Sequence, residues 1–296
     1  MINIDRRIQL AHVWFIVVAP LAGAVVATAR IPLYGVHTVA LVTSFILFVL
    51  TTLAIEVGFH RGISHQAFKA NRWLWAAFVV LGAMAAQGPG IYWAALHRTH
   101  HAHSDTERDP HSPNTDEGLR GLFRGHIGWM FEPVPLEIFD TLTDMAKMRW
   151  LLKFDRLYYL WMVLGLLLPA LFCGLVTHSR SGAIDGFLWA GLVRIFVLQH
   201  AIWSINSLCH RRGDRPFESG DRSVDVRWLA LPTMGGSLHN THHAFPSTAR
   251  NDVVPGTFDP GWWLLVVLSK VGLVTETNSP SERAVTRRSR DAKAGG

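Results

Sequence analysis

Nine histidines in three spacing patterns are the residues of this sequence with the clearest chemistry. The segment LHRTHHAHSD at 96–105 and the segment HNTHH at 239–243 share the spacing H-x-x-H-H. On a helix, positions i, i+3 and i+4 lie on one face, so each segment places three imidazoles close enough to hold one metal ion or two neighbouring ions. Imidazole suits iron, zinc, copper and nickel, so the ligand type alone leaves the metal open.

Two further segments add histidines with other spacings. HRGISH places His60 and His65 five positions apart, which leaves their rings roughly 140° apart on an ideal α-helix. Either His60 ends a membrane helix and His65 lies in the loop beyond, with Gly62 easing the bend, or the two rings address different metals. NSLCH places Asn206 and His210 four positions apart, on one helical face.

Nine imidazoles are too many for one ion, because a zinc ion usually takes four ligands. Two ions that share nine ring nitrogens, with Asn206 reached through water, fit the count better, and we expect no catalytic residue beyond the ligands. The candidate metal ligands are His60, His65, His97, His100, His101, Asn206, His210, His239, His242 and His243. The other histidines, which we interpret as structural or surface residues, are His12, His37, His103, His111, His126, His178 and His200.

Four long apolar blocks predict the helices that position these residues. The chain has 296 residues, of which 49% are hydrophobic and 17% charged, and the apolar blocks cover 12–29, 36–57, 157–176 and 183–203. Each block is near the roughly 20 residues that a helix needs to cross a bilayer, and lipid leaves the backbone no other partners. The sequence therefore predicts an all-α integral membrane protein with two helical hairpins; a soluble enzyme would need unusually long core helices.

Two weaker apolar segments are expected to lie at the membrane without crossing it. Residues 73–93 are broken by Gly88, Pro89 and Gly90, and a fifth crossing there would put the histidines of 97–101 opposite His60. Residues 261–274 are rich in tryptophan and too short to span, which suits the interface. All nine histidines then share one face, in a histidine-rich cap formed by 58–156 and 204–275.

The basic residues indicate which face that is. The net charge is +6, and nearly all of the lysines and arginines lie between the apolar blocks and at the ends. This distribution fits cytoplasmic loops that attract anionic lipids, and no nucleic-acid module is visible. We expect one domain over 1–280 with a cytoplasmic cap, followed by a disordered basic tail over 281–296. Cys173 and Cys209 form no CxxC pair, so neither a disulfide framework nor a cysteine-ligated cluster is supported.

At these residues the sequence resembles the membrane fatty-acyl desaturases, the stearoyl-desaturase-like family. The resemblance runs from about residue 55 to 250 and rests on GFHRGISHQAFKA, LHRTHHAHSDTERDPHSP, GHIGWMF, NSLCHRRGDRPFESGDRS and GGSLHNTHHAFPSTAR. It implies four spans, a cytoplasmic cap and two iron ions held by the nine histidines, with Asn206 reaching one ion through water.

The sequence departs from the family pattern at two places. Ala95 and Leu96 stand where the animal acyl-CoA enzymes have Arg-Asp, which is more like the acyl-lipid desaturases of photosynthetic bacteria. Gly236 stands where the family often has a glutamate, so another acceptor would have to orient a ligating ring. The candidate replacements are Asp214, Asp221 and Asp225.

The resemblance implies an O2-dependent enzyme of the bacterial inner membrane that inserts a cis double bond, with delta-9 the expected position. The substrate would be an acyl-lipid, acyl-CoA or acyl carrier protein, held in a bent apolar tunnel. Trp93, Trp129 and Trp203 are candidates for the tunnel wall or for interface anchors. Electrons would come from a separate ferredoxin- or cytochrome-type donor, and the residues that could guide an acidic donor or bind lipid are Arg98, Arg211 and Arg212.

Three alternatives remain open at this point. A hydroxylase or an acetylenase could use the same fold. A membrane hydrolase could use zinc at the same histidines. A metal transporter is disfavoured, because it would need polar ligands within the spans, which are nearly free of them.

Overall fold

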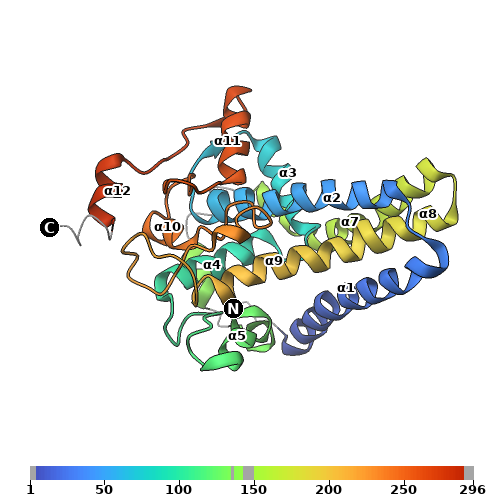
Figure 1. Ribbon diagram of the computed structural model, residues 1–296, viewed down its shortest axis with the longest axis horizontal. Helices are drawn as coiled ribbons and strands as arrows, with labels where there is room; N and C mark the ends of the chain where they lie inside the picture. The colour runs from blue at the N-terminus through green and yellow to red at the C-terminus, as the bar shows by residue number, and fades with distance from the viewer. Residues whose placement is uncertain (1–4, 135–136, 143–149, 290–296) are drawn as a thin grey trace.

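The computed structural model describes residues 5–134, 137–142 and 150–289. Long helices run side by side at one end of the molecule, and short helices and loops form a cap at the other end (Figure 1). Four helical segments are long and apolar enough to cross a membrane. They are α1 (Arg6–Tyr34), α2 (Thr38–Leu53) continued by the π-helix η1 (Ala54–Ser64), α7 (Tyr158–Thr177), and α8 (Arg180–Asp185) continued by the π-helix η4 (Gly186–Val193) and α9 (Arg194–Leu208).

The four expected spans are confirmed, and the first, second and fourth helices extend past their apolar blocks by several residues. In the second and fourth spans, η1 and the end of α9 carry His60 and Asn206 toward the cap. Large apolar side chains such as Phe45 and Leu175 face outward from the bundle. This outer surface suits lipid, and the two hairpin turns close at Gly35 and at His178, which has a left-handed backbone.

The segment 73–93 does not form one helix. Helix α3 (Arg72–Ala83) ends before the glycines, and α4 (Gly90–His103) begins after Pro89. Twelve residues in α3 are too few to cross a bilayer, as expected for a segment that does not span. The backbone N–H of Gly90 donates to Asp155 Oδ1 at 2.6 Å, so a carboxylate stabilises the start of the helix that carries the second histidine motif.

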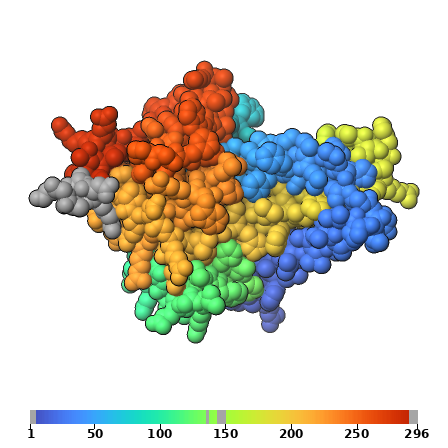
Figure 2. Space-filling model, viewed as in Figure 1, coloured from blue at the N-terminus to red at the C-terminus, as the bar shows by residue number. Residues whose placement is uncertain are grey.

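The cap is built from short elements, several of which pack on η1, α4 or α9. They are β1 (Lys69–Ala70), α5 (Gly118–His126), the 3-10 helix η2 (Gly128–Phe131), α6 (Leu151–Asp155), the 3-10 helix η5 (Arg227–Leu229), α10 (His239–Ala244), α11 (Pro260–Lys270), β2 (Val274–Thr275) and α12 (Glu282–Arg288). β1 pairs antiparallel with β2, with Lys69 opposite Thr275. Figure 2 shows the C-terminal part of the chain, in orange and red, packed on the cap away from the turn between α1 and α2.

The tail differs from the disorder expected over 281–296. Ser281 accepts a hydrogen bond from the Ala284 N–H and begins α12. Ala284 and Val285 then pack near Phe217 and Phe245, so an apolar contact holds the helix against the cap. The expectation of disorder is therefore wrong for 282–288, and residues 290–296 lie outside the described residues.

Candidate metal centre

The nine histidines singled out by their spacing converge on one place in the cap. They form two groups whose ring nitrogens lie within 4.8 Å of one another inside each group. The five-histidine group contains His60, His65, His97, His101 and His242. The four-histidine group contains His100, His210, His239 and His243.

Distances between ring nitrogens have the values expected for ligands of a common ion. His60 Nε2 lies 2.8 Å from His242 Nε2, and His65 Nε2 lies 2.8 Å from His97 Nε2. In the four-histidine group, His239 Nε2 lies 3.1 Å from His210 Nε2. Two nitrogens bound to one ion at usual bond lengths are roughly 2.8–3.4 Å apart, so both groups have suitable spacing.

The π-helix η1 explains how His60 and His65 reach the same group. The backbone N–H of His65 donates to the carbonyl of His60, five residues earlier, at 3.2 Å. Because hydrogen bonds in a π-helix join residues five apart, the His60 and His65 side chains lie on the same face. Their ring centroids are 5.2 Å apart. His65 does lie just beyond the helix, as one alternative from the sequence had it, but the helix ends at Ser64 and not at His60. The other alternative, in which the two rings address different metals, is wrong because both rings belong to one group. Gly62 serves close packing, since a Cβ there would lie 2.4 Å from the Trp75 ring.

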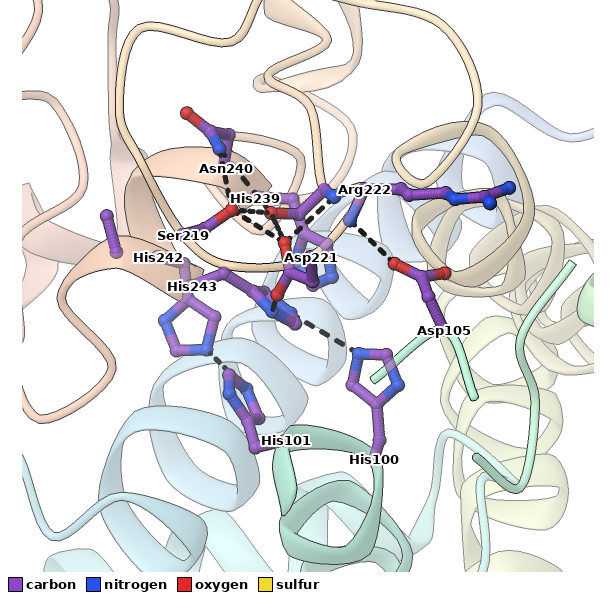
Figure 3. A network of polar contacts seen from close by, with 12 residues as sticks. His100, His101, Asp105, Ser219, Asp221, Arg222, His239, Asn240, His242 and His243 are labelled. Atoms are coloured by element: carbon purple, nitrogen blue, oxygen red, sulfur yellow. Dashed lines mark hydrogen bonds and ion pairs between the residues drawn. The ribbon is translucent and has the colours of Figure 1, made fainter. Parts of the chain in front are cut away.

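Each H-x-x-H-H motif divides its rings between the two groups. In α4, His97 and His101 join the five-histidine group while His100 joins the other. In α10, His242 joins the five-histidine group while His239 and His243 join the other. The rings of α4 and α10 therefore meet in both groups, so each group draws ligands from both helices. The contact between His242 and His101 in Figure 3 is one such meeting, in the five-histidine group.

Carboxylates orient three of the four rings in the four-histidine group. His100 Nδ1 lies 2.9 Å from Asp109, His210 Nδ1 lies 3.1 Å from Asp105, and His243 Nδ1 lies 2.5 Å from Asp221. The last contact and the Arg222 N–H that donates to Asp105 are visible in Figure 3. A carboxylate on one ring nitrogen is the usual partner of a histidine that binds metal through the other nitrogen.

The arrangement lets a metal ion take the place of hydrogen bonds between the rings. The carboxylates contact the Nδ1 atoms of His100 and His243, so the two Nε2 atoms face each other at 3.3 Å. A cation between these two nitrogens would replace the proton that His100 can carry there. Other members of the two groups could hold such a cation in the same way.

Burial keeps most of these rings neutral. It lowers the pKa of His97, His239 and His242 well below the usual value, and neighbouring histidines lower it further. Burial also lowers the pKa of His243 to about 4, although Asp221 opposes the change. His100 is the exception, because Asp109 outweighs burial and raises its pKa, so an ion would displace a proton there.

A series of neighbouring cavities leads to the two groups. Asn206 lines a chamber of about 30 Å³ together with His60, His97, His100 and His239. The next cavity, of about 40 Å³, is lined by Trp93, Trp129 and Trp203, and a mainly apolar cavity of about 260 Å³ shares two of these tryptophans. Trp129 also lines an outer cavity of about 620 Å³. All three tryptophans named as candidate tunnel walls therefore line this series.

The acceptors that orient the rings are only partly those expected. Of the three replacements considered for the missing glutamate, only Asp221 contacts a ring of either group. Asp225 accepts from the Thr241 backbone and hydroxyl, and Asp214 pairs with Arg227 at the surface. The carboxylate beside Gly236 belongs instead to Glu56, and Asp105 and Asp109 could have been noticed as acids that follow the second motif.

Two of the arginines considered for a partner protein have structural contacts instead. Arg98 donates to the carbonyls of Ser64 and Thr141, and Arg211 donates to the carbonyl of Asp116. A guanidinium group has several donors, and these two use them to tie cap segments together. Arg212 is exposed.

The remaining histidines lie outside both groups, although His111 lies close to the four-histidine group. The His111 ring is 4.5 Å from the His100 ring and shares Asp109 with it, although the spacing patterns leave it out. His126 bonds His200 at 2.9 Å, and His37 contacts Asp185 at the far end of the bundle. These contacts agree with structural roles for His37, His126 and His200.

Comparison with known proteins agrees with this geometry. A family model described as fatty acid desaturase matches residues 36–253. The chain is 36% identical over 287 residues to hex-5-enoyl-[acyl-carrier protein] acetylenase of Moorena producens, covering 95% of this chain and 89% of that protein. It is 34% identical over 246 residues to sn-1 stearoyl-lipid 9-desaturase of Synechocystis, covering 83% and 74%. It is 31% identical over 262 residues to acyl-CoA desaturase 1 of Saccharomyces cerevisiae, covering 87% and 49%. The chain therefore belongs to the fatty acid desaturase family.

Proposed function

We propose that this protein is an O2-dependent desaturase that inserts a cis double bond, at delta-9, into a saturated acyl chain. The observation that carries the proposal is the convergence of nine imidazoles into two groups beside an apolar cavity. Five histidines would hold one iron ion and four the other, with Asn206 reaching one of the ions through water. When bound, the two ions would supply the dioxygen activation that removing hydrogen from a methylene requires.

The protein's own residues would select and protect the acyl chain. A methylene group offers no hydrogen bond, so an apolar cavity must select it by shape and depth. The cavity lined by Val13, Ile16 and Met130 would take the chain, and Trp93 and Trp203 would direct it to the chamber beside Asn206. These walls would also exclude water, which limits side reactions.

Electrons would come from a separate ferredoxin- or cytochrome-type protein at the cytoplasmic face of the bacterial inner membrane. A second opening, of about 320 Å³, reaches His65, His101 and His243 from another side of the centre. It is separate from the series of cavities proposed for the acyl chain, so a donor could approach while substrate is bound. The carrier of the acyl chain is an acyl-lipid, acyl-CoA or acyl carrier protein.

Triple-bond formation is the second candidate function. The observation that favours it is the similarity to an acetylenase along 95% of this chain. Both reactions remove two hydrogens from adjacent carbons, so the same centre could perform either on a saturated or an unsaturated chain. Hydroxylation and zinc-dependent hydrolysis would differ in product and in metal.

The test is expression in a host that lacks its own desaturase, followed by mass spectrometry of its fatty acids. Saturated and monounsaturated acids are fed separately, and a new cis double bond from the saturated acid is the expected result. His101→Ala and His242→Ala should abolish the product, whereas His178→Ala, at the distant hairpin turn, should retain it. A triple bond would favour the acetylenase, and full activity of His101→Ala would refute the ligand assignment.

A further inference from the structure

The carboxylates that contact the histidine rings are distributed unequally between the two groups. Three of them, Asp105, Asp109 and Asp221, each contact a ring of the four-histidine group. Among the described residues, Glu56 is the only carboxylate in contact with a ring of the five-histidine group: it lies 3.0 Å from His60 Nδ1, without the geometry of a hydrogen bond. A carboxylate on Nδ1 makes the opposite nitrogen a stronger ligand, so the two groups differ in ligand strength.

Glu56 also shares its charge with an arginine. Arg61 is fully buried and donates to Glu56 Oε1 from Nε at 3.1 Å and from Nη2 at 2.9 Å. The same guanidinium group donates to both oxygens of Asp259, at 2.7 and 2.9 Å. Asp259 in turn accepts from the Trp262 N–H and begins α11, so a chain of charged contacts joins α11 to His60.

Gly236 holds Glu56 from the other side. A Cβ built on Gly236 would lie 2.7 Å from Glu56 Oε2, so the backbone approaches the carboxylate as closely as a glycine allows. Glu56 is therefore held between Arg61 and Gly236, with His60 Nδ1 beside it. This confinement would set the orientation of the His60 ring.

We propose that the two metal sites are unequal, with the four-histidine site binding its ion more tightly. The five-histidine site is the weaker one, and Glu56, held by Arg61 and Asp259, is its positioning residue through His60. This inference rests on the two-metal centre of the proposed function. Its physical basis is three full carboxylate charges around one site against one shared charge beside the other.

The experiment is a titration of the metal-free, full-length protein in detergent with iron(II) under anaerobic conditions, with bound iron measured in competition with a chelator. The unaltered protein should bind two ions in two separate phases. His239→Ala should remove the tighter phase and His65→Ala the weaker one, which assigns each phase to a site. Binding of fewer than two ions would contradict the proposed function itself, whatever the order of the sites.

Substitutions of the orienting residues then test the inference. Glu56→Gln should weaken only the weaker phase, by about 10–100-fold, because a lost outer contact typically costs that much affinity. Asp221→Asn should weaken only the tighter phase, and Asp214→Asn, at an exposed acid that contacts neither group, should change neither phase. If Glu56→Gln weakens both phases equally, or the phases are assigned in the reverse order, the inference is wrong.

A second variant keeps the inference testable if Glu56→Gln fails to fold. Gly236→Ala pushes on the same carboxylate from the opposite side and should weaken the same phase, and thermal melting of the metal-free protein shows whether each variant is folded. If Glu56 had only a structural role, its substitution would lower the melting temperature without selectively weakening one of the two phases. Unchanged binding by a folded Gly236→Ala would overturn the role of Glu56.

Discussion

Asp109 illustrates how much depends on single carboxylates in this protein. Its Oδ2 atom lies 2.9 Å from both His100 Nδ1 and the Asp105 backbone nitrogen, and its Oδ1 accepts from the His111 N–H. The side chain is fully buried. His100 lowers the pKa of Asp109 far below its usual value, although burial alone would raise it, so the carboxylate stays charged. One residue thus ties the end of α4 to the loop that follows.

Replacing this carboxylate should destabilise the cap as well as the metal centre. Asp109→Ala removes a charged acceptor of several buried hydrogen bonds, each worth about 1.5–3 kcal/mol, so we expect a loss of about 3 kcal/mol. Thermal melting of the metal-free protein measures the effect without any contribution from the ions. Glu107→Ala, at an exposed position two residues away, is the matched control. Equal melting temperatures for the two variants would contradict this role of Asp109.

At the scale of elements, the π-helix η1 decides how the first histidine motif is used. Its hydrogen-bond register brings two rings five residues apart to one face, and its glycines allow α3 to approach closely. A Cβ at Gly58 would lie 2.6 Å from the Phe78 side chain, and one at Gly62 would lie 2.4 Å from the Trp75 ring. The contact between η1 and α3 therefore depends on small residues on one helix and aromatic residues on the other.

This packing predicts a compensating pair of substitutions. Gly62→Ala should destabilise the protein by about 1–3 kcal/mol, because overpacking forces the Trp75 ring or the helix to move. Trp75→Leu removes the ring atoms that the new methyl group would meet. The double variant should be more stable than the sum of the single effects predicts, as measured by thermal melting in a double-mutant cycle. Additive effects would show that Gly62 is not confined by Trp75.

At the scale of the whole molecule, an even number of crossings puts both halves of the histidine centre on one side. The turns at Gly35 and His178 lie at the opposite end of the bundle from the cap (Figure 1). α3 ends at Ala83, well short of a full span, so the chain between η1 and α7 can remain on the cap side. Combined with the distribution of basic residues, this arrangement predicts a cytoplasmic cap.

Labelling of single cysteines tests this topology. Cys173 and Cys209 are buried and can first be replaced by alanine. With a reagent that does not cross membranes, Gly35→Cys should be labelled from outside the cytoplasm. Leu119→Cys, at a position that is 83% exposed in the cap, should be labelled only after the membrane is opened. Labelling of both positions from the same side would contradict the four-span topology.

The sequence by itself determined the nine histidines that converge in the cap and the number of long apolar helices. Histidine spacing and apolar length are local properties, and a stretch near the length of a bilayer has few alternatives to a helix. The break at 84–89 could be predicted for the same reason, because glycine and proline act on their own backbone. The helix α12 was missed because composition does not show the apolar contact with Phe217 and Phe245 that holds it.

Only the tertiary structure decided which rings share a group and which acids orient them. Rings on neighbouring positions of α4 and α10 separate into different groups, and this separation depends on how the two helices face each other. The register of η1 and the approach of Glu56 to Gly236 likewise depend on packing between segments far apart in the chain. Residue spacing fixes directions around one helix axis, whereas the distance between two helices is set by every side chain packed between them.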